Sequence, residues 1–273
     1  MAEEAAARRN LALRLLTAAV GVPFLLWLLY QGPPWAFPSV AAVTCALAAL
    51  ELFAIIAPGD RLAAVLGTIG TLVLFAIVAL PWARPHAVHA LIALTVLCFS
   101  LSLSRTVMNG RAAIRMGWLL AGPLYVGGLF GTISDLYRYP SGGSWVVLAL
   151  ICGFFSDTGG YFVGRRWGKR PLHPVSPNKT LEGAVAGLLA AMLGSVVARL
   201  VILPELALRT TLVLSFSATL LGQLGDLCES LIKRSVGVKD SGTMLPGHGG
   251  VLDRSDAMLF SAATVWAYVT LLT

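Results

Sequence analysis

Charged side chains are scarce in this 273-residue sequence. Aspartate, glutamate, lysine and arginine make up 12% of the residues, whereas 57% are hydrophobic. Apolar runs of about 20 residues, the length that crosses a bilayer as a helix, recur along the sequence. Because backbone polar groups need internal partners in lipid, we expect these runs to be helices, and the lack of apolar–polar alternation argues against membrane strands. The composition therefore excludes an ordinary soluble protein and indicates an all-α polytopic membrane protein.

Cysteine is also rare, and its spacing excludes further classes. Cys45, Cys98, Cys152 and Cys228 each lie alone in an apolar run, without a CxxC or Cys/His pattern. We expect small packing residues here, and neither disulfides nor zinc. The net charge of +7 could suggest nucleic acid, but the basic residues lie between apolar runs. Membrane topology and anionic lipid explain that charge better, so we expect no nucleic-acid partner.

The apolar runs predict nine membrane helices. Their expected ranges are 11–30, 36–57, 62–81, 86–104, 116–137, 144–163, 181–203, 210–232 and 255–272. Turn signals such as Pro58-Gly59-Asp60 separate them. We expect two regions: residues 1–115 with about four helices, and residues 116–273 with about five.

The distribution of basic residues predicts the orientation of these helices. With the N-terminus in the cytoplasm, sixteen of the twenty lysines and arginines lie on the cytoplasmic side and four on or near the other. This asymmetry follows the positive-inside rule. It places the two long polar segments, 164–180 and 233–254, together on the cytoplasmic side, where we expect a polar cavity in the C-terminal half.

Glu51 is the exceptional charged residue within the first four expected helices. A carboxylate in an apolar run is costly and is by default a functional candidate. A snorkelling or interhelical structural role is an equal alternative, because the sequence shows no partner for it.

Asp157 belongs to the stretch FFSDTGGYFVGRRWGK, residues 154–169. Since it follows a strongly apolar run, we expect it to face a polar cavity, a metal or a basic group. A helix-end salt bridge with Arg165 or Arg166 is the structural alternative. The glycine pair at 159–160 permits close contact between helices.

Lys179 belongs to the stretch PLHPVSPNKTLEG, residues 171–183. Its two X-Pro steps predict extended backbone. Thr180 is then a good helix N-cap, and Glu182 lies in the first turn, where the helix dipole favours an acid. Lys179 adds positive charge just before that helix N-terminus, an arrangement that suits a phosphate, although the signal is weak by itself.

A polar stripe precedes the last loop, in LGQLGDLCESLIKR. Asp226, Ser230 and Lys233 are spaced i, i+4, i+7 and therefore share one helical face, with Glu229 beside it and Gln223 one turn earlier. On a membrane helix such a stripe must face the bundle interior.

The loop that follows combines charge with a glycine-rich turn. It contains Lys239, Asp240 and Gly247-His248-Gly249-Gly250, and Asp253-Arg254-Ser255-Asp256 opens the last helix. Hard oxygen ligands without a Cys/His cluster suit Mg²⁺, and Asp226 with Asp253 is the natural pair. The cations Lys233, Arg234, Lys239 and Arg254 could clamp phosphate oxygens. His248 could donate to a phosphate or stabilise the turn. The alternative, a solvated charged loop, leaves the intramembrane Asp226 and the turn unexplained.

These residues resemble the signature of the phosphatidate cytidylyltransferases, also called CDP-diacylglycerol synthases. The matching positions are Ser230, Lys233-Arg234, Lys239-Asp240, Gly242, Pro246, His248-Gly249-Gly250, Asp253-Arg254 and Asp256. The stretches SDTGGYFVGRRWGK and SPNKTLEG also resemble family segments, so the resemblance covers about residues 144–273. It departs at Ser255, usually apolar or threonine, and at Ala257, usually serine.

The resemblance implies the reaction CTP + phosphatidate → CDP-diacylglycerol + pyrophosphate. It also implies Mg²⁺, with K⁺ as a second metal in the family, a homodimer, and a bacterial-type inner (plasma) membrane with the active site on the cytoplasmic side. The expected catalytic residues are Asp226, Asp253, Lys233, Arg234, Lys239 and His248, with Asp226 and Asp253 also as metal ligands. The expected substrate-binding residues are Ser230, Lys179, Arg254, Asp157, Gly249 and Gly250.

Two other function classes fit part of the pattern. An ion-coupled transporter also places polar residues in broken helices, but it predicts acids near the bilayer midplane and a repeat between the halves. Here the charge lies at one surface and in the second half. Another lipid-headgroup enzyme, such as a CDP-alcohol phosphotransferase or a polyprenol kinase, is the nearer alternative. The former needs several aspartates in one DGxxAR-type helix, which this sequence lacks.

Overall fold

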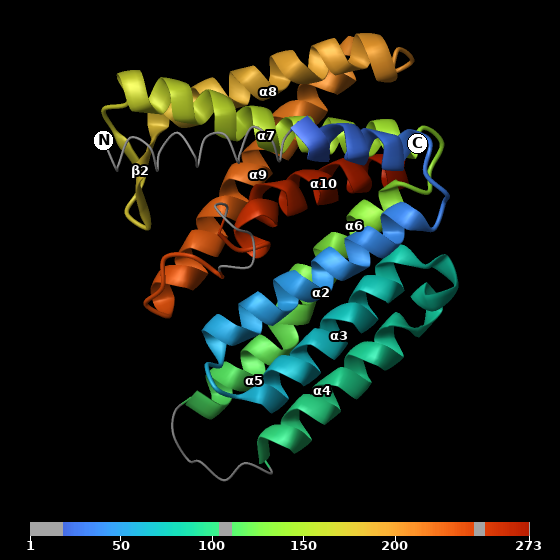
Figure 1. Ribbon diagram of the computed structural model, residues 1–273, viewed down its shortest axis with the longest axis vertical. Coiled ribbons are helices and arrows are strands. Elements are labelled where there is room, and N and C mark those ends of the chain that lie inside the picture. Colours follow the sequence, from blue (N-terminus) through green and yellow to red (C-terminus); the bar gives the residue numbers. More distant parts are fainter. Residues whose placement is uncertain (1–18, 104–110, 243–248, 273) are drawn as a thin grey trace.

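The computed structural model describes residues 19–103, 111–242 and 249–272. Within these ranges, eight helical segments are long and apolar enough to cross a membrane (Figure 1). They are α2 (Ala36–Ile56), α3 (Arg61–Ala79), a 3₁₀ turn (Pro81–His86) continuing into α4 (Ala87–Leu103), α5 (Arg111–Gly122) continuing through a π-helix (Pro123–Gly128) into α6 (Leu129–Leu136), α7 (Gly142–Trp167), α8 (Leu181–Ile202), α9 (Leu208–Ser235) and α10 (Leu252–Leu272). The protein is an all-α polytopic membrane protein, as predicted.

A shorter apolar helix, Ala19–Tyr30, precedes these eight. It corresponds to the first expected helix, of which residues 11–18 lie outside the described residues. The other expected helices all appear, with ends displaced by a few residues.

The segment expected as one helix over 116–137 contains an irregularity. It starts at Arg111, and a π-helix over Pro123–Gly128 interrupts its α-helical turns. A proline inside a helix removes one backbone hydrogen bond and clashes with the preceding turn. Widening to a π-helix lets the helix continue past Pro123 without a break.

Helices α7 and α9 are longer than their apolar runs, with 26 and 28 residues. Each carries two basic residues in its last turn, Arg165 and Arg166 in α7 and Lys233 and Arg234 in α9. Cations at a helix C-terminus interact favourably with the helix dipole, so the helices extend beyond the apolar boundary into the polar region.

A two-stranded antiparallel hairpin joins α7 to α8. Its strands are β1 (Pro171–His173) and β2 (Ser176–Thr180). The extended backbone was predicted, but the pairing was not. The Thr180 hydroxyl accepts a hydrogen bond from the Gly183 N–H at 3.1 Å, which confirms the N-cap of α8. Glu182 Oε2 accepts from the backbone N–H groups of Lys169 and Arg170, and so ties the base of the hairpin to the start of α8.

Helix α10 joins the two parts of the bundle. Figure 1 shows α7 and α8 side by side, with α2 to α5 forming a separate group. Helix α10 contacts α7 and α9 on one side and α2 and α6 on the other. Small residues let α7 and α8 approach closely, because a Cβ on Gly183 would lie 2.8 Å from the carbonyl oxygen of Gly160.

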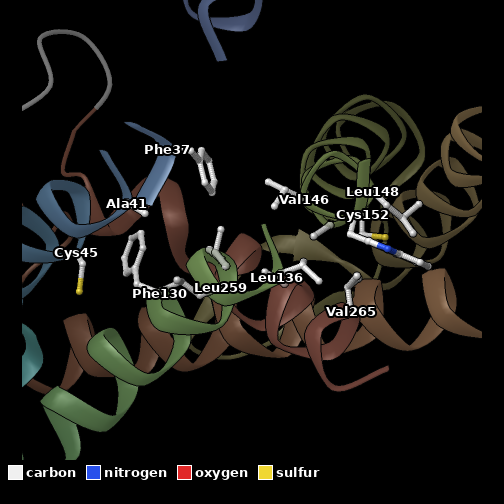
Figure 2. Close-up of a cluster of buried hydrophobic side chains, with 14 of the residues drawn as sticks. Phe37, Ala41, Cys45, Phe130, Leu136, Val146, Leu148, Cys152, Leu259 and Val265 are labelled. Carbon is white, nitrogen blue, oxygen red and sulfur yellow. The ribbon is translucent and has the colours of Figure 1, made fainter. Parts of the chain in front are cut away.

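The largest apolar cluster lies where these helices meet (Figure 2). It includes Phe37 of α2, Phe130 of α6, Cys152 of α7 and Leu259 of α10, all buried. Lipid is as apolar as these side chains, so close packing holds the helices together more than exclusion from water does. Cys45 and Cys98 are buried like Cys152, whereas Cys228 is exposed.

A buried acid closes the end of the bundle opposite the hairpin. Asp135, near the end of α6, is 2% exposed and forms an ion pair with Arg84. It also accepts a hydrogen bond from Trp266 Nε1 at 2.8 Å. Arg138 donates to the carbonyl oxygen of Ala79 at 3.1 Å. These contacts tie α6, α10 and the turn between α3 and α4 together.

Candidate active site

The polar stripe of α9 faces the interior of the bundle, as predicted. Gln223 begins it and connects three helices. Its Nε2 donates to the Ser156 hydroxyl of α7 at 3.0 Å and to the Ala184 carbonyl oxygen of α8 at 2.9 Å. This junction holds α9 against the helix pair that carries the hairpin.

Lys179 reaches from the hairpin to the next turn of the stripe. Its ammonium forms an ion pair with the Asp226 carboxylate. Partial burial lowers the pKa of Lys179 below the usual value for lysine, while the nearby carboxylates of Asp256 and Asp157 act in the opposite direction. The hairpin therefore supplies a cation at the acidic face of α9.

Lys233 connects two acids further along. Its Nζ lies 3.0 Å from Glu229 Oε2 and 2.6 Å from Asp253 Oδ1. Asp253 lies in the first turn of α10, where backbone N–H groups lack partners within the helix. Its carboxylate accepts from the N–H groups of Ser241 and Gly250, each at 3.0 Å. Asp253 thereby joins the two ends of the last loop to α9.

Asp226, Glu229 and Asp256 form an acidic cluster. One oxygen from each of the three carboxylates lies within 4.8 Å of the others. Glu229 is fully buried, and its Oε1 has no hydrogen-bond partner in the described part of the chain. The Tyr125 hydroxyl is buried without a partner as well, and interacts electrostatically with Glu229 and Asp256. A buried carboxylate oxygen without a donor is an unmet acceptor that a cation could satisfy, and three carboxylates this close together could hold Mg²⁺.

The neighbours of Asp226 differ from the predicted pair. The structure brings Asp256 and Glu229 to Asp226, whereas the Asp253 carboxylate contacts Lys233 and the loop. Asp253 and Asp256 lie three residues apart and so on one side of α10, but the Asp253 carboxylate is occupied by donors that precede the helix, on Ser241 and Gly250, and by Lys233. A metal role for Asp253 stays a prediction.

The other predicted cations lie nearer to solvent. Arg234 is exposed and donates to the Val238 carbonyl oxygen at 3.1 Å, which closes the turn after α9. Lys239 and Arg254 are also exposed, and Ser230 is half-buried. None of these positions conflicts with phosphate binding.

The predicted glycine turn is described in part. Gly249 has φ +81°, a conformation that favours glycine, and Gly250 is buried. His248 lies outside the described residues. Gly249 and Gly250 follow it directly and lead into α10.

Asp157 lies on α7, near Lys179 of the hairpin and near the start of α10. It is exposed and interacts electrostatically with Lys179, Arg254 and Asp256. Arg165 and Arg166, the alternative partners for a helix-end salt bridge with Asp157, make other contacts. Arg165 donates to the Tyr161 hydroxyl at 2.7 Å, and the guanidinium carbon of Arg166 lies 5.4 Å from the Trp167 ring centroid. This placement favours the interpretation that Asp157 faces the polar site.

The sequence did not predict that Glu229 and Asp256 belong to the acidic cluster. Glu229 was only placed beside the polar face, and Asp256 was assigned no separate role. The signal was present, because Glu229 follows Asp226 and Asp256 follows Asp253 at i+3 spacing. Acids three residues apart lie on the same side of one helix, so each of the two helices carries a second acid next to the first.

Comparison with known proteins shows the family of the chain. The family model described as "Cytidylyltransferase family" matches residues 12–272. The chain belongs to the cytidylyltransferase family. The match includes both the acidic cluster and the membrane helices of the first half, which by sequence resembled the family only in being hydrophobic.

Three curated relatives are named phosphatidate cytidylyltransferase. A phosphatidate cytidylyltransferase of Staphylococcus saprophyticus is 38% identical over 185 residues, covering 66% of this chain and 68% of the relative. The Helicobacter pylori enzyme of that name is 47% identical over 137 residues, covering 49% and 48%. The Bacillus subtilis enzyme is 36% identical over 171 residues, covering 62% and 64%. The aligned segments thus span between about half and two thirds of these relatives.

Proposed function

We propose that the protein is a phosphatidate cytidylyltransferase, which converts CTP and phosphatidate to CDP-diacylglycerol and pyrophosphate. The observation that carries this proposal is the acidic cluster of Asp226, Glu229 and Asp256 between two lysines, at one end of an apolar bundle. Such a site suits a phosphorylated substrate with acyl chains, because the cluster can take a cation and the lysines can take phosphate. Family membership and the names of the relatives support the same reaction.

The reaction needs positioning and charge neutralisation more than acid–base chemistry. A phosphate oxygen of phosphatidate attacks the α-phosphorus of CTP, and the bond from that phosphorus to the oxygen bridging to the β-phosphate breaks. Pyrophosphate leaves with the bonding electrons. Because the attacking phosphate oxygen is already anionic, no proton need be removed from it. Lys179 and Lys233, held on either side of the cluster by their carboxylate partners, would stabilise the developing negative charge.

The acidic cluster would hold the divalent cation. Asp226, Glu229 and Asp256 offer the oxygens, with Asp253 as the further predicted ligand. When bound, Mg²⁺ neutralises nucleotide phosphates and makes the α-phosphorus more electrophilic. We also propose K⁺ as a second metal, on the family resemblance alone. Titrating activity with Mg²⁺ at several K⁺ concentrations tests both.

Pyrophosphate release from the purified protein tests the function. With Mg²⁺, CTP and phosphatidate, we expect release that depends on all three components. The absence of release, or equal release from ATP without lipid, would contradict the proposal. A product of the mass of CDP-diacylglycerol distinguishes it from other lipid-headgroup transferases.

We further propose a homodimer with the active site facing the cytoplasm. The basic residues of the segments 164–180 and 233–254 support this orientation through the positive-inside rule. The dimer rests on the family resemblance. Native mass spectrometry in detergent should show a species of twice the 28.8 kDa chain mass, and a single-chain species throughout would contradict it.

A further inference from the structure

Glu51 connects the first half of the protein to the active-site loop. It lies on α2, is only 4% exposed, and is the only charged residue of that helix. Its Oε2 accepts a hydrogen bond from the Leu252 N–H at 2.9 Å, 201 residues later in the chain. It also accepts from the Ser241 hydroxyl at 3.3 Å. Glu51 thus faces the interior of the bundle, which excludes snorkelling to the surface.

The backbone around the carboxylate leaves no room for another side chain. A Cβ on Gly242 would lie 2.6 Å from Glu51 Oε1, and one on Gly250 would lie 2.6 Å from Oε2. Glycines at both positions allow the two ends of the loop to close on the carboxylate. Oε1 itself has no hydrogen-bond partner among the described residues.

Glu51 and Asp253 hold the same two loop ends. Ser241 donates its N–H to Asp253 and its hydroxyl to Glu51. At the other end, Gly250 donates to Asp253, and Leu252 donates to Glu51. Asp253 in turn contacts Lys233, beside the acidic cluster. A displacement of Glu51 would therefore move the loop ends, and with them Asp253 and its contact to Lys233.

We propose that Glu51 is a positioning residue for the reaction, acting through the loop ends at 241–242 and 250–252. The hydrogen bonds of Glu51 in the described residues go to Ser241 and Leu252 of the loop ends. By accepting from Ser241 and Leu252, it determines where Gly250, Asp253 and the start of α10 lie relative to Lys233. The proposal rests on the proposed function, since it assigns Glu51 to the loop that carries Asp253 to the acidic cluster of that site.

Kinetics of the full chain in lipid–detergent micelles test this role, with pyrophosphate release as the measurement. Glu51→Leu keeps a similar volume but leaves both donors unpaired. We expect kcat/KM for CTP to fall roughly tenfold or more, because hydrogen bonds to a charged acceptor are lost, with KM for phosphatidate unchanged. Glu51→Gln should retain most activity, since its amide oxygen can accept both hydrogen bonds.

Ser241→Ala removes one of the two donors and should cause a smaller loss. Because both changes act on one contact, the double variant E51L/S241A should be no worse than E51L. Asp135→Asn is the matched control, since Asp135 is equally buried but lies at the opposite end of the bundle. It should lower the thermal midpoint and leave KM for CTP unchanged.

A wild-type kcat/KM in E51L would overturn the proposal, and so would a loss in E51Q equal to that in E51L. The proposal would also fail if the loss of activity in E51L matched the loss of folded protein, which is the result expected for D135N. Hydrogen exchange at residues 239–242 and 249–252 gives a measurement independent of activity, and E51L should exchange faster there. An inactive wild type contradicts the proposed function instead, and faster exchange in E51L would still support the loop contact.

Discussion

The three carboxylates of the acidic cluster differ in their hydrogen-bonding partners. Asp226 has an ion pair with Lys179, Glu229 has one with Lys233 and an unpaired oxygen, and the Asp256 carboxylate accepts from the Ala257 N–H. Lys179 offsets Asp226, whereas Lys233 is shared between Glu229 and Asp253, so the carboxylates at the site outnumber these two lysines. An excess of this kind favours cation binding and makes each acid separately testable.

Asp226→Asn should reduce activity by at least about a hundredfold, because it removes a charge from the centre of the cluster. Asparagine has nearly the same shape, so the protein should still insert and give an unchanged elution volume. The measurement is pyrophosphate release under saturating substrates. Glu205→Gln, an exposed acid between α8 and α9, is the control and should behave as wild type. Turnover like the wild type in D226N would remove Asp226 from the site.

Asp256→Asn and Asp253→Asn test two acids of α10 separately: Asp256, which belongs to the acidic cluster, and Asp253, which binds the ends of the last loop. We expect Asp256→Asn to raise the Mg²⁺ concentration at half-maximal activity about tenfold or more, because a carboxylate next to Asp226 and Glu229 is lost. Asp253→Asn should mainly raise KM for CTP, because Lys233 and the Ser241 and Gly250 N–H groups lose a charged acceptor. If the two variants show the opposite pattern, the predicted metal pair of Asp226 and Asp253 is favoured.

At the scale of elements, the contact between α7 and α8 determines where the hairpin lies. The N-terminus of α8 follows β2 directly, so any separation of the two helices would move Lys179 away from Asp226. Gly183 lies one turn into α8, opposite Gly160 of α7. The close approach therefore matters for the site as well as for stability.

Gly183→Ala should destabilise the protein by about 1–3 kcal/mol, because its Cβ would lie 2.8 Å from the Gly160 carbonyl oxygen. Alanine normally stabilises a helix relative to glycine by up to about 1 kcal/mol. A loss of stability in G183A would therefore indicate the close contact rather than helix propensity. Gly117→Ala on α5 is the matched control, since nothing lies within 4 Å of its Cβ position. Thermal unfolding in detergent measures both, and a G183A midpoint at or above that of G117A would contradict the close approach.

The elements themselves were largely predictable from hydropathy. Apolar runs predicted each membrane helix, and the Thr180 N-cap followed from residue type and position. The π-helix at Pro123–Gly128 was not predicted, because Pro123 in an apolar run is equally compatible with a kink or a break. The pairing of β1 with β2 also escaped prediction, since an X-Pro step limits one residue's backbone and does not choose a partner.

Among the described residues, the lysine–carboxylate pairs lie at one end of the bundle, and the Asp135–Arg84 pair lies at the other. The site itself could be predicted as a set of residues but not as a set of contacts. Helical spacing put Asp226 and Lys233 on one face, whereas the partnership of Glu51 with Leu252 depends on how distant helices pack.

Cysteine labelling in intact cells should reveal the orientation. In a background with Cys228→Ser, which leaves three buried cysteines, we expect Glu205→Cys to react with a maleimide that does not cross the inner membrane. Lys239→Cys should react only after the membrane is permeabilised, because the positive-inside rule places it in the cytoplasm. Labelling of the lysine position alone in intact cells would reverse the orientation.

The contact between Glu51 and Leu252 has a consequence for synthesis. The ribosome makes α2 first, and the two residues are separated by 201 positions. At about 5–20 residues per second, Glu51 waits roughly 10–40 s in the membrane before Leu252 is even polymerised. A charged side chain there costs about 2.5–3.5 kcal/mol for insertion, which the surrounding apolar residues of α2 must outweigh without help. During that interval α2 must hold Glu51 in the membrane without the hydrogen bonds from Ser241 and Leu252 that the later loop supplies.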